Sequence, residues 1–453
     1  MKLPSRTMIA RLGWATTAHS ATQGIRLVVS LILTRLLAPE VFGIMLIVNT
    51  LRTGAELLSD IGVGQNVIAS PNGEKQEFLD TAWTLQLIRG AALGLVIAAC
   101  AWPVAAIYKS DIFGQVLPLA GALVFILGAE SINRFIAQRR QNLAQFTTFE
   151  ISMAIGGGFI QVGFAWAFPN VWGLIYANLA GAVLIVLCSF FFFPGWTPKL
   201  RLDRAHAKEI LHFGKWIFLS SVVYFISTNF DRLYLGAAIP LALLGVFGVA
   251  RSLAEVVATF VTRIGNSIIF PAVATAGSHR AELRAKLAHS RLPLILLAAT
   301  GLSVFVALSD EIIHILYDQR YRDAGYMLPI LATGVWFTVL ATMGESVMLG
   351  IGRPVYSAAG NVAKLIWLVI ALPIAVTTHG VIGGVLVIAL ADGIRYLPIW
   401  WAQKRCHLSF ARQDLGVTLL MFAMIGLWRE VFGLVGLTSG WSGWWAMARS
   451  SMA

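Results

Sequence analysis

The stretch LIVNTLRTGAELLSDIG, from Leu46 to Gly62, carries three charged residues inside a long apolar run. Arg52, Glu56 and Asp60 follow one another at steps of four, so in a helix their side chains share one face. A charge at the centre of a bilayer costs about 2.5–3.5 kcal/mol on insertion scales, and such charges therefore face a helix bundle or a wet cavity. The rest of the chain decides whether this helix lies in a membrane.

The composition of the whole chain is that of a membrane protein. Of its 453 residues, 58% are hydrophobic and 12% are charged, and the mean hydropathy is +0.76. Soluble domains are about 25% charged and about 45–50% apolar. The net charge of +12 favours basic loops against anionic lipid rather than nucleic-acid binding. The three cysteines form no CxxC or metal-type cluster, so neither a disulfide framework nor a metal site is expected.

Apolar segments long enough to span a bilayer recur along the chain and predict an all-α polytopic membrane protein. We expect twelve core spans, at roughly 12–36, 41–68, 82–107, 113–137, 147–168, 171–194, 211–237, 241–272, 291–316, 325–350, 355–377 and 380–402. A further apolar tail, about 415–447, is interrupted by Arg429 and Glu430. It predicts either a hairpin of two short spans or one long span, which would bring the total to as many as fourteen.

The loop charges predict the orientation of the chain. Lysines and arginines gather in alternate loops, and the opposite loops hold Lys109, Arg320 and Arg322. By the positive-inside rule the N-terminus is cytoplasmic. The basic first twenty residues lack a short apolar core followed by a cleavage site, so we expect them to lead into a retained first span.

The longest central polar stretch divides the core into two sets of six spans. We expect an N-terminal lobe (1–194), a cytoplasmic linker (195–210), a C-terminal lobe (211–402) and a tail with one or two extra spans (403–453). The halves echo each other weakly at offsets of about 202 residues, in Trp14 and Trp216, Gly43 and Gly245, and DIG (60–62) and RIG (263–265). An even number of spans per half predicts a parallel repeat around a central cavity. Chance matching of common residues is the alternative.

Charged residues inside the predicted spans are the candidate site. The eighth span carries Arg251, Glu255 and Arg263, an echo of the opening stretch, and Arg26 and Lys364 lie in two other spans. Several charges are spaced to pair within their own helices, and a purely structural role is the alternative for these: Arg52–Glu56, Arg251–Glu255, Glu130–Arg134 and Asp392–Arg395. Asp231 and Arg232 are candidates for pairing across the lobes.

Two features favour a binding function. Arg26 and Lys364 have no acid at helical spacing, and arginine, which forms forked hydrogen bonds with phosphate, predominates at mid-span positions. We therefore expect an anionic substrate, such as a pyrophosphate or an acidic sugar. The candidate substrate-binding residues are Arg26, Arg52, Arg251, Arg263 and Lys364. The candidate coupling or pairing residues are Glu56, Asp60, Asp231, Glu255 and Glu345.

Glu345 has no basic partner at helical spacing. A lone carboxylate within a membrane can take up a proton, or it can bond a neighbouring helix. No nucleotide, zinc or catalytic motif is present, so no cofactor is expected beyond coupling to protons or sodium.

Two stretches resemble a known family. TRLLAPEVFGIMLIVNTLRTGAELLSDIGVGQNVIAS (Thr34 to Ser70) and NFDRLYLGAAIPLALLGVFGVARSLAEV (Asn229 to Val256) resemble the signatures of Wzx-type oligosaccharide flippases. These belong to the polysaccharide branch of the multidrug/oligosaccharidyl-lipid/polysaccharide exporter superfamily. The resemblance implies two six-helix lobes around a cationic cavity. It also implies a bacterial inner-membrane transporter that moves an undecaprenyl-pyrophosphate-linked glycan to the periplasmic leaflet by alternating access.

The resemblance also bears on the site, because the related lipid II flippase has functional arginines in spans one, two and eight. In this chain Arg26, Arg52 and Arg251 occupy those three spans. Here Arg52 and Arg251 each have a glutamate four residues on. This departure has two interpretations: the glutamate holds the guanidinium in place, or it partly neutralises the charge. The expected partners are the lipid-linked glycan, the bilayer and other polysaccharide assembly proteins, with no nucleic acid.

Three other functions stay open. A multidrug cation exporter of the same superfamily would need acids to predominate in the cavity. An integral-membrane glycosyltransferase or polymerase would need a large outward loop or a carboxylate cluster, whereas Tyr317–Gly325 is short. A non-transporting scaffold would have no use for so many intramembrane charges.

Overall fold

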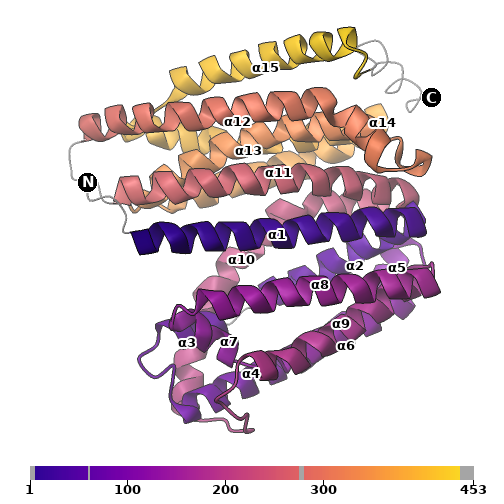
Figure 1. Cartoon of the computed structure of the whole chain (residues 1–453), viewed down its shortest axis with the longest axis vertical. Coiled ribbons are helices and arrows are strands. Elements are labelled where there is room, and N and C mark those ends of the chain that lie inside the picture. The colour runs from indigo at the N-terminus through magenta and orange to yellow at the C-terminus, as the bar shows by residue number, and fades with distance from the viewer. Residues whose placement is uncertain (1–5, 60–61, 275–279, 439–453) are drawn as a thin grey trace. The chain divides into compact units, whose positions relative to one another are not determined.

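The computed structural model describes residues 6–59, 62–274 and 280–438. Within helices it leaves out the side chains of 6–20, 211–220, 260–272, 280–283 and five single positions (143, 205, 209, 274 and 286). Every regular element in the described ranges is helical (Figure 1). The elements are α1 (Arg6–Leu36), α2 (Pro39–Leu58), α3 (Val63–Ala69), α4 (Gln76–Ala99), α5 (Ala101–Tyr108), α6 (Ile112–Gly128), α7 (Asn133–Arg139), α8 (Leu143–Ala167), α9 (Val171–Phe192), α10 (Arg204–Ala238), α11 (Leu241–Ala274), α12 (Arg280–Leu316), η1 (Gln319–Tyr321), α13 (Ala324–Gly350), α14 (Val355–Arg405) and α15 (Ala411–Leu434).

The helices confirm an all-α polytopic membrane protein. Among the described residues, eight helices are long and apolar enough to cross a bilayer, and the bent pair α6 and α7 would add a ninth. Ten of the twelve expected core spans each coincide with one helix or with two consecutive helices, and the last two expected spans share α14. The exact number that cross a membrane stays a prediction.

Two spans that we expected to be continuous are broken. The span at 41–68 divides into α2 and α3. Gly62 between them has a backbone φ of +67°, which residues other than glycine rarely adopt. The span at 113–137 divides into α6 and α7, whose axes meet at 56°. A hydropathy average misses such breaks because the residues on either side are equally apolar.

Side chains of α4 satisfy the carbonyls that the breaks leave free. Trp83 Nε1 donates to Ala129 O at 3.3 Å, and Gln86 Nε2 donates to Gly128 O at 3.0 Å. Arg89 Nη2 donates to Glu56 O at 2.7 Å. These donors follow at steps of three on one face of α4, so a single helix supports both breaks. An unpaired carbonyl at membrane depth costs several kcal/mol, which explains polar residues on an otherwise apolar helix.

The last helices refine two further expectations. Gly380, with φ +62° and ψ −154°, kinks α14 between the expected spans 355–377 and 380–402. The tail is a single helix, α15, as far as Leu434, and it continues through Arg429 and Glu430 without a turn. Arg429 is tolerated there because its Nη2 lies 2.7 Å from Asp310 Oδ2 of α12, with both side chains buried. Residues 439–447 of the expected tail lie outside the described ranges.

The chain folds as two compact units, residues 1–225 and 226–453. The boundary between them falls inside α10, after the extended segment 193–203 that follows α9. The expected linker, 195–210, therefore covers most of that segment and the first turns of α10. The units are described one at a time below.

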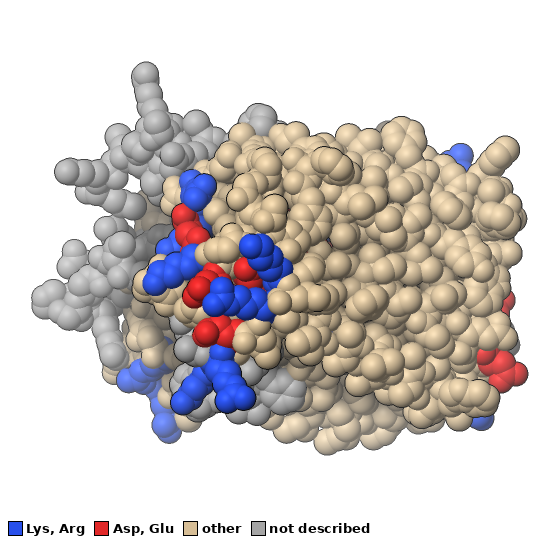
Figure 2. Space-filling view, turned by 90° about the horizontal axis from the view of Figure 1, so that it is seen from below, with Lys and Arg blue, Asp and Glu red and all other residues tan. Residues whose placement is uncertain are grey.

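Exposed charges of the first unit gather at one end. Glu74 pairs with Arg140 at 2.8 Å and Glu77 pairs with Arg201 at 3.0 Å, and the hydrogen bond from Arg140 lowers the pKa of Glu74. Figure 2 shows charged side chains clustered at one end and a long, nearly uncharged surface beside them. An apolar belt with charges at its end is what a bilayer requires of a spanning bundle.

Candidate functional site

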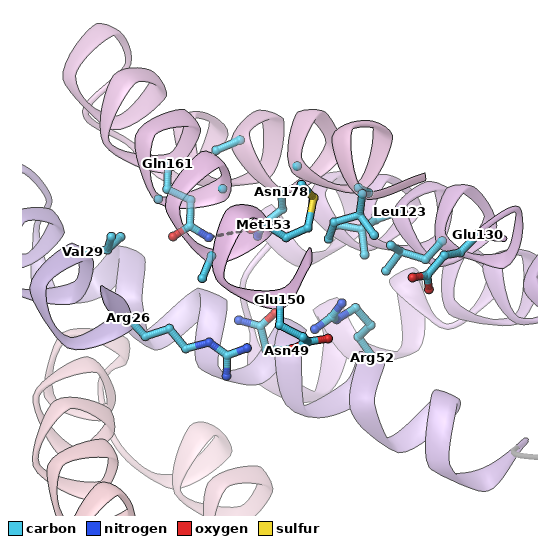
Figure 3. A pocket seen from close by; sticks show the side chains of 18 of the residues that line it. Arg26, Val29, Asn49, Arg52, Leu123, Glu130, Glu150, Met153, Gln161 and Asn178 are labelled. Atoms are coloured by element: carbon cyan, nitrogen blue, oxygen red, sulfur yellow. Dashed lines mark hydrogen bonds between the residues drawn. The ribbon is translucent and has the colours of Figure 1, made fainter. Parts of the chain in front are cut away.

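The first unit has an open cavity of about 510 Å³ that is lined by two of the expected binding residues. Residues of α1, α2, α6, α8 and α9 line it. Glu130, in the break between α6 and α7, and Arg134, in α7, complete the lining. Arg26 projects from α1 and Arg52 from α2, and Figure 3 shows both among the side chains that line the cavity, with Asn49 of α2 and Glu150 of α8. We call this space the arginine cavity.

The arginines of this cavity have hydrogen-bond donors to spare. Arg26 forms no ion pair or hydrogen bond with the side chains that the structure describes. Arg52 Nη1 lies 3.7 Å from Glu56 Oε1, and the buried Nε of Arg52 has no acceptor. Arg134 Nη1 lies 2.5 Å from Glu130 Oε1, and its buried Nε also lacks one. Buried donors without acceptors are costly, so the cavity is suited to a ligand rich in acceptor oxygens.

The net charge of the lining is positive. Arg26, Arg52 and Arg134 face two acids, Glu130 and Glu150. Glu150 forms no ion pair with any described side chain. An excess positive charge between apolar helices attracts anions more strongly than the same charge in water.

Several lining residues were missed by the sequence reasoning. Glu150 shows the signal that singled out Glu345, an acid without a base at helical spacing, and would have been found by the same test. Asn49, Gln161 and Asn178 carry no such signal, because uncharged amides are common on helices. Gln161 Nε2 donates to Asn178 Oδ1 at 3.3 Å, and the pair lies along the cavity in Figure 3.

In the second unit, the expected residues of α10 and α11 form a connected set of ion pairs. Arg251 Nε lies 2.9 Å from Glu255 Oε1, and Arg251 Nη2 lies 3.6 Å from Asp231 Oδ2. Arg232 also pairs with Glu255. Asp231 and Arg232 thus pair inside one unit, and the expectation that they pair across the lobes is wrong. Their partners, Arg251 and Glu255, lie on the adjacent helix α11.

A second set of ion pairs joins α13 and α14. Lys364 Nζ lies 3.0 Å from Asp392 Oδ1, which also lies 3.6 Å from Arg395 Nη1. Arg395 pairs in turn with Glu345, whose other carboxylate oxygen accepts a hydrogen bond from Ser357. Lys364 and Glu345 lack partners at helical spacing, as expected. Asp392, beyond the kink of α14, pairs with Lys364, and Arg395 of α14 pairs with Glu345 of α13. The Asp392–Arg395 pairing is the one that the spacing predicts.

Of the remaining candidates, Asp60 lies outside the described residues, and Arg263 lies in α11 with its side chain outside them. The structure thus brings Arg26 and Arg52 together in one cavity and places Glu56 beside Arg52. Arg251, Glu255 and Asp231 form one cluster, and Lys364 and Glu345 belong to another.

Solved structures of low sequence identity share this fold. A structure of the lipid II flippase MurJ in an inward closed conformation aligns with a TM-score of 0.75, at 12% identity and with 95% of each chain covered. An inward-facing multidrug resistance MATE family transporter of the MOP superfamily aligns with a TM-score of 0.62, at 15% identity, over 86% of this chain and 94% of that one.

The sequence itself has a relative among proteins of polysaccharide assembly. It is 24% identical over 403 residues to the lipopolysaccharide biosynthesis protein WzxC of Escherichia coli (strain K12), covering 84% of this chain and 78% of the relative. The sequence family described as "Polysaccharide biosynthesis protein" matches residues 32–325, which is more than half of the chain. That match includes Arg52 and most of the lining of the arginine cavity, though it begins after Arg26, and it includes the ion pairs of α10 and α11. The chain belongs to the polysaccharide biosynthesis protein family.

Proposed function

We propose that this protein is a transporter that flips an undecaprenyl-pyrophosphate-linked oligosaccharide from the cytoplasmic to the periplasmic leaflet of a bacterial inner membrane. The transported unit serves exopolysaccharide or O-antigen assembly. The family, the similarity to WzxC and the fold shared with a lipid II flippase support the class of substrate. The N-terminus is cytoplasmic in this proposal.

The observation that carries the proposal is the set of unsatisfied arginine donors in the arginine cavity. Arg26 has no partner among the described side chains, and Arg52 and Arg134 each keep a buried Nε without an acceptor. A pyrophosphate presents many acceptor oxygens and several negative charges, and guanidinium groups bind such oxygens through paired hydrogen bonds. In the proposal, Arg26 and Arg52 bind the pyrophosphate.

The charges of the second unit have a supporting role. Arg251 and Lys364 are already held by carboxylates, so a ligand would have to compete with Asp231, Glu255 or Asp392 for them. Such competition suits alternating access, in which a charge binds substrate in one state and its carboxylate in the other. Arg263 belongs to the same proposed group. A proton or sodium ion at Asp231 or Glu345 would compete for the same pairs.

The proposal is tested by deleting the gene and following the lipid-linked repeat unit. We expect the unit to accumulate on the cytoplasmic leaflet, where a membrane-impermeant glycosidase applied to inside-out vesicles releases its sugars. The wild-type gene should clear this pool. The Arg26→Ala and Arg52→Ala variants should clear it at least about tenfold more slowly, because a hydrogen bond to a charged group contributes about 1.5–3 kcal/mol.

Arg204→Ala is the matched control, since Arg204 is an exposed arginine at the start of α10 that does not line the arginine cavity. It should behave as the wild type does at equal protein abundance. Deletion without accumulation, together with new sensitivity to cationic drugs, would instead identify a multidrug exporter.

A further inference from the structure

We propose that a second pocket in the first unit, next to the arginine cavity, binds the sugar residues of the transported lipid. This pocket has a volume of about 630 Å³, which lies within the range of about 300–1,000 Å³ usual for ligand sites. Its lining includes three glutamines, Gln65, Gln86 and Gln138, and we call it the amide pocket. The inference rests on the function proposed above.

The amide pocket is built from the two helix breaks. Gln65 lies on α3 and Gln138 on α7, the short helices that follow the breaks. Gly64 lets these helices approach closely, since a Cβ there would lie 2.5 Å from the ring of Phe135. Broken helices in membrane transporters line binding sites because irregular backbone is tolerated only beside a cavity or inside protein.

The two sites share one wall. Glu130 and Arg134, with Leu127 and Ile185, line both the arginine cavity and the amide pocket. In the proposal, a single ligand extends from one site into the other past the Glu130–Arg134 pair. A sugar joined directly to a pyrophosphate has this kind of extended, two-part structure.

The amide pocket differs from the arginine cavity in its charge. Its two acids, Glu56 and Glu130, are balanced by its two bases, Arg89 and Arg134. Arg89 donates hydrogen bonds to the C-terminal end of α2, from Nε to Ser59 Oγ at 3.0 Å and from Nη2 to Glu56 O at 2.7 Å. The pocket thus offers no excess charge to a second phosphate and favours a neutral polar group.

The free groups of the pocket match the chemistry of a sugar. The side-chain amides of Gln65 and Gln138 form no hydrogen bond within the part of the chain that the structure describes. An amide offers both donors and an acceptor, and a hydroxyl group can use both. Phe135 adds a ring to the lining, which packs against Gly64 and lies under the Arg134 guanidinium at 5.0 Å. Hydroxyl groups on a compact ring therefore fit this pocket better than an acyl chain does.

The test compares two probes on the purified full-length protein in lipid nanodiscs. One probe is undecaprenyl pyrophosphate, and the other is the same lipid carrying a single glucose. We expect the wild type to bind the glucose-bearing probe more tightly. The double variant Gln65→Ala/Gln138→Ala should lose about tenfold in affinity for it, the effect of about two neutral hydrogen bonds, and should bind undecaprenyl pyrophosphate unchanged.

Two controls keep the test specific. Gln115→Ala removes an exposed glutamine of α6 that lines neither site, and it should preserve the preference for the glucose-bearing probe. Arg26→Ala should weaken both probes alike, because it acts on the pyrophosphate that they share.

The contradicting outcomes are distinct. Equal affinity of the wild type for both probes, or a preference that survives in the double variant, would overturn the amide pocket and leave the proposed function standing. A double variant that loses both probes would also overturn it, since the glutamines would then serve the pyrophosphate or the fold. A wild type that binds neither probe would overturn the proposed function itself.

Discussion

Arg52 carries its charge at the edge of the arginine cavity with one loosely held partner. Glu56 Oε1 is 3.7 Å from its Nη1, and both side chains are partly exposed. Pairs of this kind on a helix surface contribute only about 0.3–0.5 kcal/mol. Glu56 therefore lowers the positive charge of the cavity without fixing the guanidinium in place.

Replacing Glu56 should strengthen binding of the head group. In Glu56→Gln the side chain keeps its size while Arg52 loses its competing carboxylate, so affinity for undecaprenyl pyrophosphate should rise about two- to threefold. Equilibrium binding in nanodiscs measures this change. Glu77→Gln, which breaks the exposed pair with Arg201, is the control and should have no effect. A fall in affinity in Glu56→Gln would mean that the glutamate orients Arg52 for the ligand.

Sequence spacing predicted the local charge pairs but not the pairs between helices. Arg52–Glu56, Arg251–Glu255 and Asp392–Arg395 follow from steps of three or four residues on one helix. The pairs Lys364–Asp392 and Arg395–Glu345 join residues far apart in the sequence. Lys364 and Asp392 come together because α14 is kinked between them, and Arg395 and Glu345 come together because α13 packs against α14. No pattern in a single sequence contains that information.

Close packing between α4 and α6 supports the helices that surround the two sites. A Cβ on Gly121 would lie 2.4 Å from Gly94 O, and a Cβ on Gly94 would lie 2.7 Å from Gly121 O. Further along, a Cβ on Gly90 would lie 3.1 Å from the Cα of Gly128. Small residues at such contacts allow helix backbones to meet within a bilayer.

A methyl group at this contact should destabilise the protein, because backbone atoms must move to admit it. Gly121→Ala should lower the free energy of unfolding by about 1–3 kcal/mol and reduce the thermal unfolding midpoint in detergent. Gly114→Ala is the matched control on the same helix, since nothing lies within 4 Å of a Cβ there, and it should leave the midpoint unchanged or raise it slightly. Equal midpoints for the two variants would show that the α4–α6 contact relaxes freely.

Hydropathy predicted where the spans lie but not how they are interrupted. The breaks before α3 and α7 need a glycine of positive φ and a set of donors on α4, which lies next to both only in the folded chain. At Arg429 the charge interrupts the apolar pattern, which left a hairpin open as one of two alternatives, and α15 continues through it. Its partner Asp310 is 119 residues away in the sequence, so the helix looked less favourable than it is.

At the scale of the whole molecule, the fold alone does not distinguish between the candidate transporters. A lipid II flippase and a multidrug resistance transporter both share it. The family match and the charges inside the first unit carry the distinction, because three arginines in one cavity favour an anion over a cationic drug. The charges in the predicted spans favoured an anionic substrate, and the resemblance of two stretches implied the family. Arg134 and the amide pocket came only from the structure.

Flipping by the purified protein tests the central claim most directly. The full-length chain would be reconstituted in liposomes whose outer leaflet holds a fluorescent undecaprenyl pyrophosphate carrying one sugar, and its loss from that leaflet would be followed. The wild type and Arg204→Ala should move this lipid much faster than protein-free liposomes do, and Arg26→Ala/Arg52→Ala should move it at the protein-free rate. A double variant that flips the lipid as fast as the wild type, or a wild type no faster than bare liposomes, would contradict the account.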